Sequence, residues 1–270
     1  MNRMNQDYEE HGYFVQRNFF SEDELRPLKR LLTNFHHAWQ QQHASDYAER
    51  AVNSAYITGR EHLNEQQRLQ LFHFIASTKL MRIVNDVLAE GATFMNSQLF
   101  FDPANPAQKN YWHRDPQYHL SIDEQKTALS GPEVVHLRIP LVDEPGIELI
   151  PGSHRRWDSN EELAVRLQHG QRKNYQALDS GVTVELAAGD LLVFSANMIH
   201  RGLYGMDRLS FDILFCDPEP DLLTFIADDC LPEPNILEQL EDASAFEKTL
   251  AIKAKLSQQI DNIHLEVSKS

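Results

Sequence analysis

The chain has 270 residues, 41% of them hydrophobic, and its 40 acidic and 25 basic side chains give a formal net charge of −15. This length can bury one sizeable core, whereas the negative charge repels polyanions, so nucleic acid and anionic membrane surfaces are poor candidate partners. The two cysteines, Cys216 and Cys230, suggest neither a disulfide framework nor a zinc site. The sequence shows no leader-like start and no apolar run long enough to span a membrane, so we expect a reduced cytoplasmic setting.

The first third of the chain is predicted to be helical. Residues 21–42 repeat apolar side chains at helical spacing, and Ser21 with Glu24 forms a capping-box pattern at the start of that helix. Residues 64–76 and 78–89 are expected to form two further helices.

The middle of the chain is predicted to carry the strands. Val134–Leu141 and Arg208–Phe215 have the composition of strands, and Ala188–Phe194 that of a turn followed by a buried strand. Residues 155–178 form a polar excursion, which we interpret as a helix and loop lying over the site.

Beyond Pro220 the sequence becomes helical and charged again, and it contains no internal repeat or low-complexity tract. We therefore expect one domain over residues 1–270. Its parts would be a helical N-terminal part at about 21–90, a β core at about 93–216 and a helical C-terminal tail at about 221–270.

Three side chains of the metal-ligand type distinguish this sequence. His113 and Asp115 lie in Tyr-Trp-His-Arg-Asp-Pro, and His200 lies in Asn-Met-Ile-His-Arg-Gly. In an extended segment, residues two apart project to the same face, so His113 and Asp115 can take adjacent positions on one ion. His200 falls at a strand end, where a loop can present it to the same ion. Two histidines and one carboxylate, with the opposite positions open, form the ligand set of non-haem Fe(II) oxygenases.

The His-x-acid pattern is weak by itself, because residue frequencies alone predict about two matches in this chain. The second match, His264-Leu-Glu266, lies in a polar tail and is interpreted as accidental. The first has a supporting context, because Arg208 and Ser210 follow His200 and share one face of the next strand. A guanidinium fork and a hydroxyl group suit a ligand carboxylate.

In this context the chain resembles the phytanoyl-CoA dioxygenase family of Fe(II)/2-oxoglutarate oxygenases. The resemblance extends from about Tyr8 to Phe215. It is carried by motifs that occur in the family's order: Glu10–Leu25, His113-x-Asp115, Gly146–His154, Gly189-Asp190, His200-x-Gly202 and Arg208.

The resemblance implies a mainly β fold with helical decoration, in which a double-stranded β-helix (jelly roll) core is flanked by N- and C-terminal helices. It further implies that His113, Asp115 and His200 bind Fe(II), and that 2-oxoglutarate and O2 are co-substrates. The protein would supply orientation and a shielded cavity, while the metal and co-substrate carry the oxidation.

The resemblance also implies how 2-oxoglutarate is held. Arg208 would pair with its distal carboxylate, and Ser210 is a second contact to the same group. Gln98, or Asn96 on the same strand, would hydrogen-bond the co-substrate.

The implied activity is hydroxylation of a small-molecule metabolite, with release of succinate and CO2. Related halogenases replace the carboxylate ligand by a small residue, so Asp115 favours an ordinary oxidation. Two alternatives are open. One is a cupin-like jelly-roll metal enzyme that does not use 2-oxoglutarate, which would leave Arg208 and Ser210 without a carboxylate to bind. The other is a non-catalytic binding relative, which would have no chemical need for a complete ligand set. The substrate and the oligomeric state are not specified by the sequence.

Substrate contacts are predicted around the metal motif and on the strand that follows it. Arg138 would meet a substrate carboxylate or phosphate if its strand face points inward, and solvent or a structural acid if it does not. His154, in Pro-Gly-Ser-His, is expected to be structural. Four neighbours of the metal motif either line the pocket or pack beside it: Trp112, Gln117, Tyr118 and His119.

Overall fold

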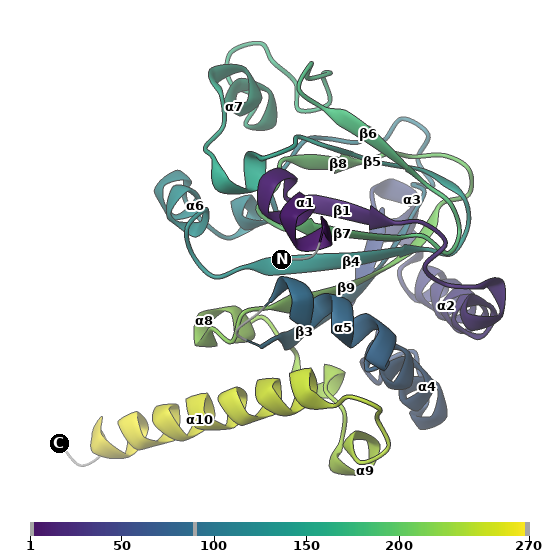
Figure 1. The fold of residues 1–270 in the computed structure, drawn as a ribbon, viewed down its shortest axis with the longest axis vertical. Coiled ribbons are helices and arrows are strands. Elements are labelled where there is room, and N and C mark those ends of the chain that lie inside the picture. Colours follow the sequence, from purple (N-terminus) through teal and green to yellow (C-terminus); the bar gives the residue numbers. More distant parts are fainter. Residues whose placement is uncertain (1–2, 89–90, 268–270) are drawn as a thin grey trace. The chain divides into compact units, whose positions relative to one another are not determined.

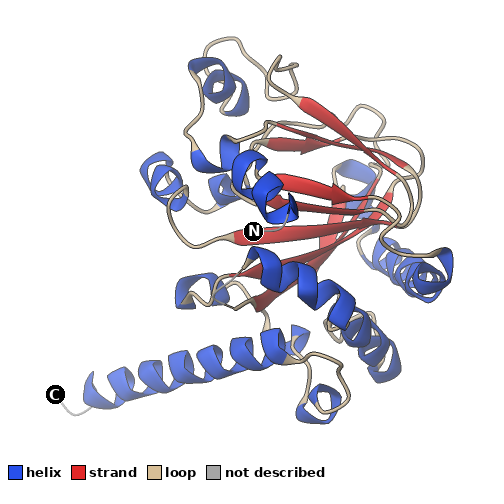
Figure 2. Cartoon of the chain, viewed as in Figure 1, coloured by secondary structure: helices blue, strands red, loops and turns tan. Residues whose placement is uncertain are grey.

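The computed structural model describes residues 3–88 and 91–267 of the chain, as helices and strands joined by loops (Figure 1, Figure 2). The strands are β1 (Tyr13–Gln16), β2 (Asn53–Ala55), β3 (Thr93–Phe101), β4 (Val134–Pro140), β5 (Glu144–Leu149), β6 (Val182–Leu186), β7 (Leu191–Ser195), β8 (His200–Gly202) and β9 (Leu209–Cys216). The α-helices are α1 (Arg3–His11), α2 (Glu22–Gln42), α3 (Ala44–Glu49), α4 (Glu65–Ile75), α5 (Thr78–Val87), α6 (Ile122–Ala128), α7 (Asn160–Arg166), α8 (Pro220–Leu223), α9 (Pro234–Leu237) and α10 (Ser244–Val267). Short 3-10 helices are η1 (Asp115–Tyr118), η2 (Ser153–Arg155) and η3 (Asp228–Cys230).

Backbone contacts divide the chain into two compact units. The first contains the residues up to Ala55 together with Gln98–Ile213, and the second contains Tyr56–Ser97 together with the residues from Leu214 onward. The organisation as one domain over 1–270 therefore stays a prediction.

Two antiparallel sheets are built mainly from residues of the first unit. The larger sheet has the strand order β1-β7-β4-β9-β3-β2, and the smaller has the order β6-β5-β8. Neighbours in these sheets are mostly distant in sequence, which is the connectivity of a jelly roll rather than of a meander. The predicted jelly-roll fold class, with helices before and after the strands in the chain, is confirmed.

An apolar cluster joins the two sheets of the first unit. Phe194 and Leu192 come from β7 of the larger sheet, and Ile147 and Leu149 come from β5 of the smaller sheet. All four side chains are removed from solvent. Burial of side chains of this size stabilises each by about 1.5–3 kcal/mol, so this cluster fixes the distance at which polar side chains from the two sheets face each other.

The helix at 21–42 was correctly predicted from its helical spacing of apolar residues and its capping motif. The first long helix begins after Ser21, whose side chain accepts from the Glu24 amide while the Glu24 carboxylate accepts from the Ser21 amide. The predicted helices at 64–76 and 78–89 correspond to α4 and α5, although residue 89 lies outside the described residues.

The motif Gly146–His154 resembles the family's turn between the metal-binding strands, but its first half belongs to the strand β5. Gly146 has a φ of +86°, and a Cβ at this position would lie 1.8 Å from the carbonyl oxygen of Val184 on β6. The pairing register shifts between Glu144 and Ile147, so the glycine marks a β-bulge within a strand. The turn follows at Gly152, which is also left-handed.

The second unit contains α4, α5 and the helices that follow β9. Phe72 of α4 packs edge-on against Phe246 of α10 at 5.3 Å, and Phe94 lies 4.7 Å from the same ring. Arg68 of α4 is buried and pairs with Glu233 at 2.7 Å. Among the described residues, no helix is both long and apolar enough to cross a membrane.

Candidate active site

His113, Asp115 and His200 meet at one end of the first unit. The backbones of His113 and His200 exchange two hydrogen bonds, of 3.0 and 2.9 Å, as an isolated bridge at the edge of β8. Asp115 begins η1, and its amide donates to the Ala196 carbonyl oxygen at 3.2 Å. The expected extended segment thus ends at Arg114, and a 3-10 turn presents the carboxylate.

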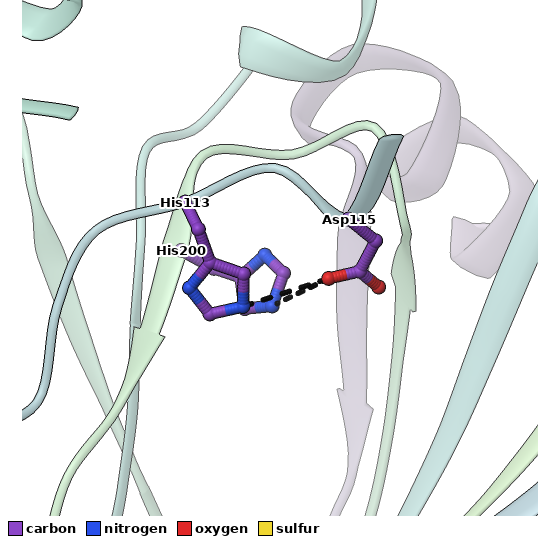
Figure 3. A group of neighbouring side chains, drawn as sticks. All are labelled: His113, Asp115 and His200. Carbon is purple, nitrogen blue, oxygen red and sulfur yellow. Dashed lines mark ion pairs between the residues drawn. The ribbon is translucent and has the colours of Figure 1, made fainter. Parts of the chain in front are cut away.

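The three side chains converge through the atoms that bind metals. Asp115 Oδ1 lies 3.5 Å from His113 Nε2 and 3.6 Å from His200 Nε2, as Figure 3 shows. All three candidate ligand atoms lie within 4.8 Å of one another. They form one group that could hold a metal ion.

Backbone carbonyl groups determine which ring nitrogens face the centre. His113 Nδ1 lies 3.0 Å from the Tyr111 carbonyl oxygen, and His200 Nδ1 lies 3.0 Å from the Met198 carbonyl oxygen. A carbonyl oxygen can only accept, so each Nδ1 carries hydrogen and each neutral ring presents the Nε2 lone pair. Burial lowers the pKa of His113, and it lowers the pKa of His200 to about 3, so both rings are neutral near pH 7.

The second oxygen of Asp115 is bound by the protein. His136, on β4, lies with Nε2 2.7 Å from Asp115 Oδ2 and with Nδ1 3.3 Å from Asp212 of β9. Burial alone would lower the pKa of His136, but these two carboxylates raise it to about 9, so the ring donates from both nitrogens. Burial would raise the pKa of Asp115, yet the surrounding imidazoles, His200 and His136 first, hold it below its usual range. His136 therefore fixes Asp115 with only Oδ1 directed at the centre.

Arg114, between the first two ligands, ties the metal-bearing segments together. It is 1% exposed, and its guanidinium donates to Asp158 at 2.9 Å and to the carbonyl oxygens of Ser153, Asn197 and Arg156. Asn197 belongs to the turn that leads to His200, so one side chain connects both segments. Burial lowers the pKa of Arg114 to about 10, which still leaves it charged near pH 7.

Asp158 extends this buried network. Its second oxygen accepts from Arg166 of α7 at 2.8 Å, and Arg166 also donates to Gln117 Oε1 at 2.7 Å. Gln117, predicted as a substrate contact, accepts from the Arg114 amide as well. Within the described structure its side-chain oxygen therefore supports the metal motif.

Arg208 and Ser210, predicted to bind a ligand carboxylate, both contact Glu144 of β5. Ser210 Oγ donates to Glu144 Oε2 at 2.5 Å, and Arg208 Nε donates to the same oxygen at 3.3 Å. Phe100 lies under the Arg208 guanidinium at 5.4 Å. A Cβ on Gly202 would lie 2.8 Å from Arg208 Nη1, so the glycine of His-x-Gly makes room for this side chain.

Arg138 faces inward and meets a structural acid. Its Nε and Nη2 atoms donate to the two oxygens of Asp212, each at 2.8 Å, and its guanidinium lies 4.6 Å from the Phe100 ring. Arg138 Nη1 is buried and has no partner among the described residues. Alternation on β3 places both Asn96 and Gln98 on the same strand face as Phe100, and Asn96 accepts from the amides of Tyr56 and Ser97.

The remaining predicted contacts divide into packed and exposed groups. Trp112 is buried, donates to the Gln176 carbonyl oxygen at 2.9 Å and stacks under Arg201. Tyr118 is 51% exposed, and its ring lies 5.7 Å from that of His113. His119 is exposed beyond it, and His154 is buried away from the three candidate ligands.

Sequence reasoning missed three buried side chains that organise the site. Glu144, Asp212 and Asp158 each bind an arginine or histidine from a segment far away in the chain. The signal that could have found Asp212 was present, because it lies two residues after Ser210 on the predicted strand. Glu144 and Asp158 lie beside expected turns and resemble surface acids.

Solved structures with a similar fold come from several enzymes. EctD from S. alaskensis in its apoform superimposes with a TM-score of 0.58 at 17% identity, covering 81% of this chain and 77% of that chain. AviO1 from Streptomyces viridochromogenes Tue57 has a TM-score of 0.54 at 16% identity, with 80% and 94% covered. The non-haem α-ketoglutarate-dependent epimerase SnoN, from nogalamycin biosynthesis, has a TM-score of 0.50 at 16% identity, with 80% and 82% covered. At these identities the likeness establishes the fold alone.

The sequence has no significant match among curated proteins. The profile of one protein family, described as Phytanoyl-CoA dioxygenase (PhyH), matches residues 8–203. This match covers well over half of the sequence, so the chain belongs to the phytanoyl-CoA dioxygenase family.

Proposed function

We propose that this protein is an Fe(II)- and 2-oxoglutarate-dependent dioxygenase that hydroxylates a small-molecule metabolite and releases succinate and CO2. The observation that carries the proposal is the convergence of His113 Nε2, His200 Nε2 and Asp115 Oδ1 within 4.8 Å of one another. Family membership supports an oxygenase-type activity. The structural neighbour EctD has been solved with Fe and with 2-oxoglutarate and 5-hydroxyectoine, which supports the same cofactors here.

The donor set fits an Fe(II) ion. Bonds from metals to imidazole nitrogen and carboxylate oxygen are about 2.0–2.2 Å long, so two donors at right angles on one ion lie about 3 Å apart. The observed separations of 3.5 and 3.6 Å need only a small inward movement. Two imidazoles and one carboxylate on one face leave the opposite positions for a co-substrate and oxygen.

Buried donor atoms near this centre fit the carboxylate of 2-oxoglutarate. Arg208 Nη2 is buried and has no partner among the described residues. An unsatisfied buried donor of this kind costs about 1–3 kcal/mol, which a ligand carboxylate would recover. We assign Arg208 as the anchor, with Ser210 and Gln98 as further co-substrate contacts.

When bound, Fe(II) with 2-oxoglutarate and O2 supplies the oxidising chemistry. The protein's own groups then determine orientation. His136 holds Asp115 in a one-oxygen geometry, and the Nδ1 hydrogen bonds of His113 and His200 keep both Nε2 atoms directed inward. Asp115 occupies the position that must be vacated to admit a halide, so we favour hydroxylation.

The substrate contacts that we propose lie at the outer side of the metal motif. Tyr118 donates to the hydroxyl group of Tyr111 at 3.0 Å, and both rings lie within 6 Å of the His113 ring. Further proposed contacts are the exposed His119, the packed side chains of Trp112 and Gln117, and the inward-facing Arg138, which has one donor without a partner among the described residues. The free buried cysteines agree with our proposal of a cytoplasmic location.

Anaerobic titration with Fe(II) and then 2-oxoglutarate tests the proposal. We expect a weak visible charge-transfer band only when both are present, and we expect Arg208→Ala to lose the band while retaining iron. Arg208→Ala leaves Glu144 buried without its cation, so the double variant Arg208→Met with Glu144→Gln controls for folding. Tight iron binding without any band in the folded wild-type protein would instead favour a metal chemistry that does not use 2-oxoglutarate.

A further inference from the structure

We propose that Glu144 is a built-in competitor for the carboxylate anchor, so that dicarboxylates without a metal-chelating end bind this site weakly. This inference rests on the proposed function, because it assigns Arg208 as the anchor. The inference assigns a role in ligand selectivity to Glu144 of β5, which is not one of the candidate metal ligands.

The donors expected to hold a ligand carboxylate already hold a carboxylate of the protein. Glu144 Oε2 accepts from Ser210 Oγ at 2.5 Å and from Arg208 Nε at 3.3 Å. The exposed fractions are 2% for Glu144, 3% for Arg208 and 0% for Ser210, so water does not screen these contacts. A carboxylate that enters must therefore share or replace the Glu144 contacts.

The contacts between Glu144 and Arg208 leave one buried polar atom of each side chain unpaired among the described residues, so Arg208 can still bind a ligand. Glu144 Oε1 and Arg208 Nη2 are both buried and have no partner among the described residues. The Nη edge of Arg208 lies against Gly202, two residues after the candidate ligand His200. Glu144 thus holds the Nε edge of the guanidinium and leaves the other edge on the side of β8, the strand that bears the metal ligand.

The negative charge of Glu144 opposes binding of a second carboxylate even if the Glu144 side chain stays in place. Three cations, Arg138, Arg208 and the doubly protonated His136, face three anions, Asp212, Glu144 and Asp115, in this part of the interior. A dicarboxylate adds two negative charges to this balanced group. A chelating dicarboxylate has its charge offset by the two positive charges of Fe(II), whereas one that lacks the chelating end depends on the anchor alone.

The consequence is discrimination between 2-oxoglutarate and its product. Succinate retains the distal carboxylate but lacks the keto acid group that chelates a metal. An internal carboxylate that reclaims Ser210 and the Nε edge of Arg208 weakens the binding of both ligands at the anchor, and only 2-oxoglutarate has metal chelation to offset that loss.

Binding of glutarate to the metal-free protein tests this inference. Glutarate has the two carboxylates of 2-oxoglutarate without the keto group, and calorimetric titration measures its affinity without any turnover. Glu144→Gln keeps the shape and an acceptor oxygen but removes the charge, and we expect glutarate to bind about tenfold more tightly or better, which corresponds to about 1.4 kcal/mol.

A matched control comes from the same strand. Glu148 is also on β5 and pairs with Arg201, away from the anchor. Glu148→Gln removes the same charge and should leave glutarate affinity at the wild-type value. The double variant Arg208→Met with Glu144→Gln should lose the gained affinity, because the anchor itself is gone.

Equal, weaker or undetectable glutarate binding by Glu144→Gln would overturn the inference and would make Glu144 a support for Arg208 instead. If Glu144→Gln does not fold, Glu144→Asp withdraws the carboxylate from Ser210 by one methylene, and it too must bind glutarate more tightly than the wild type. The outcome is separable from that of the proposed function. A charge-transfer band without the glutarate effect refutes only the competitor role, whereas the glutarate effect without a band refutes only the iron and 2-oxoglutarate chemistry.

Discussion

The metal-ligand group and the proposed carboxylate anchor lie in the same unit, but the protein treats their ligand-facing atoms in opposite ways. At the metal group, the protein binds the outward atoms, His113 Nδ1, His200 Nδ1 and Asp115 Oδ2, and leaves the inward atoms open. At the anchor, the protein's own Glu144 takes the donors of Arg208 and Ser210. The first region is preorganised for a cation, whereas a ligand carboxylate at the proposed anchor would have to share or replace the contacts of Glu144.

The largest expected effect is loss of Fe(II) binding when a single metal ligand is removed. His200→Ala removes one of three protein donors, and we expect Fe(II) binding to be lost at micromolar metal. The fold should persist, because the backbone bridge to His113 does not involve the side chain. Anaerobic equilibrium dialysis measures the bound metal.

His169→Ala is the matched control, because His169 is exposed in the loop after α7. It should bind Fe(II) as the wild type does. Retention of one tight Fe(II) by His200→Ala would show that the ion is held elsewhere, and the contrast between the two regions would then fail.

An intermediate effect, on the free energy of unfolding, is expected from loss of the buried contacts that Arg114 makes beside the metal ligands. Arg114→Met leaves Asp158 buried with one cation fewer and leaves three carbonyl oxygens without their donor. Removing one partner of a buried charged network destabilises a protein by about 3–5 kcal/mol. Urea unfolding measures this loss as a lower midpoint.

The comparison variant for Arg114→Met is Arg172→Gln. Arg172 pairs with Glu161 at 3.2 Å, and both side chains are about half exposed. A pair of this kind contributes less than about 1 kcal/mol. If the two variants unfold at the same urea concentration, Arg114 does not tie the metal-bearing segments together.

The sequence predicted the grouping of the three metal-ligand side chains but not the buried acid beside the proposed anchor, and the cause is physical. His113, Asp115 and His200 were recognised from their residue types together with the motifs around them, and the family match over residues 8–203 confirms the resemblance from which the iron role was inferred. Helices with an N-terminal capping motif and apolar side chains at helical spacing, such as α2, could be predicted equally well. These features depend on neighbours within a few residues.

The features that could not be predicted depend on partners far away in the chain. Glu144 and Arg208 are separated by 64 residues, and Arg138 and Asp212 by 74. Strand alternation showed that His136 and Arg138 share a face, but not which way the face points or which acids lie opposite. The strand β5 was missed because Gly146 resembles a turn glycine, although it serves a bulge.

The smallest expected effect is the pH dependence of stability that comes from the Arg156–Glu162 pair, which lies next to the contacts of Arg114. Arg156, whose carbonyl oxygen accepts from Arg114, holds Glu162 of α7 through two hydrogen bonds of 2.7 Å. Burial alone would raise the pKa of Glu162, but Arg156 and the Ser159 amide lower it from 4.5 to about 2. The folded protein therefore binds fewer protons here than the unfolded chain. This part of the stability is complete above about pH 4.5 and is lost as the pH falls toward 2.

Glu162→Gln should remove this pH-dependent part, and the difference is about 1 kcal/mol because Arg156 is 43% exposed and solvent screens the pair. Urea midpoints between pH 5 and pH 3 measure it: the wild type should lose stability more steeply than Glu162→Gln. Glu161→Gln, at an exposed neighbouring position, should follow the wild-type slope. Parallel slopes for the wild type and Glu162→Gln would show that the Arg156–Glu162 pair does not carry this acid sensitivity.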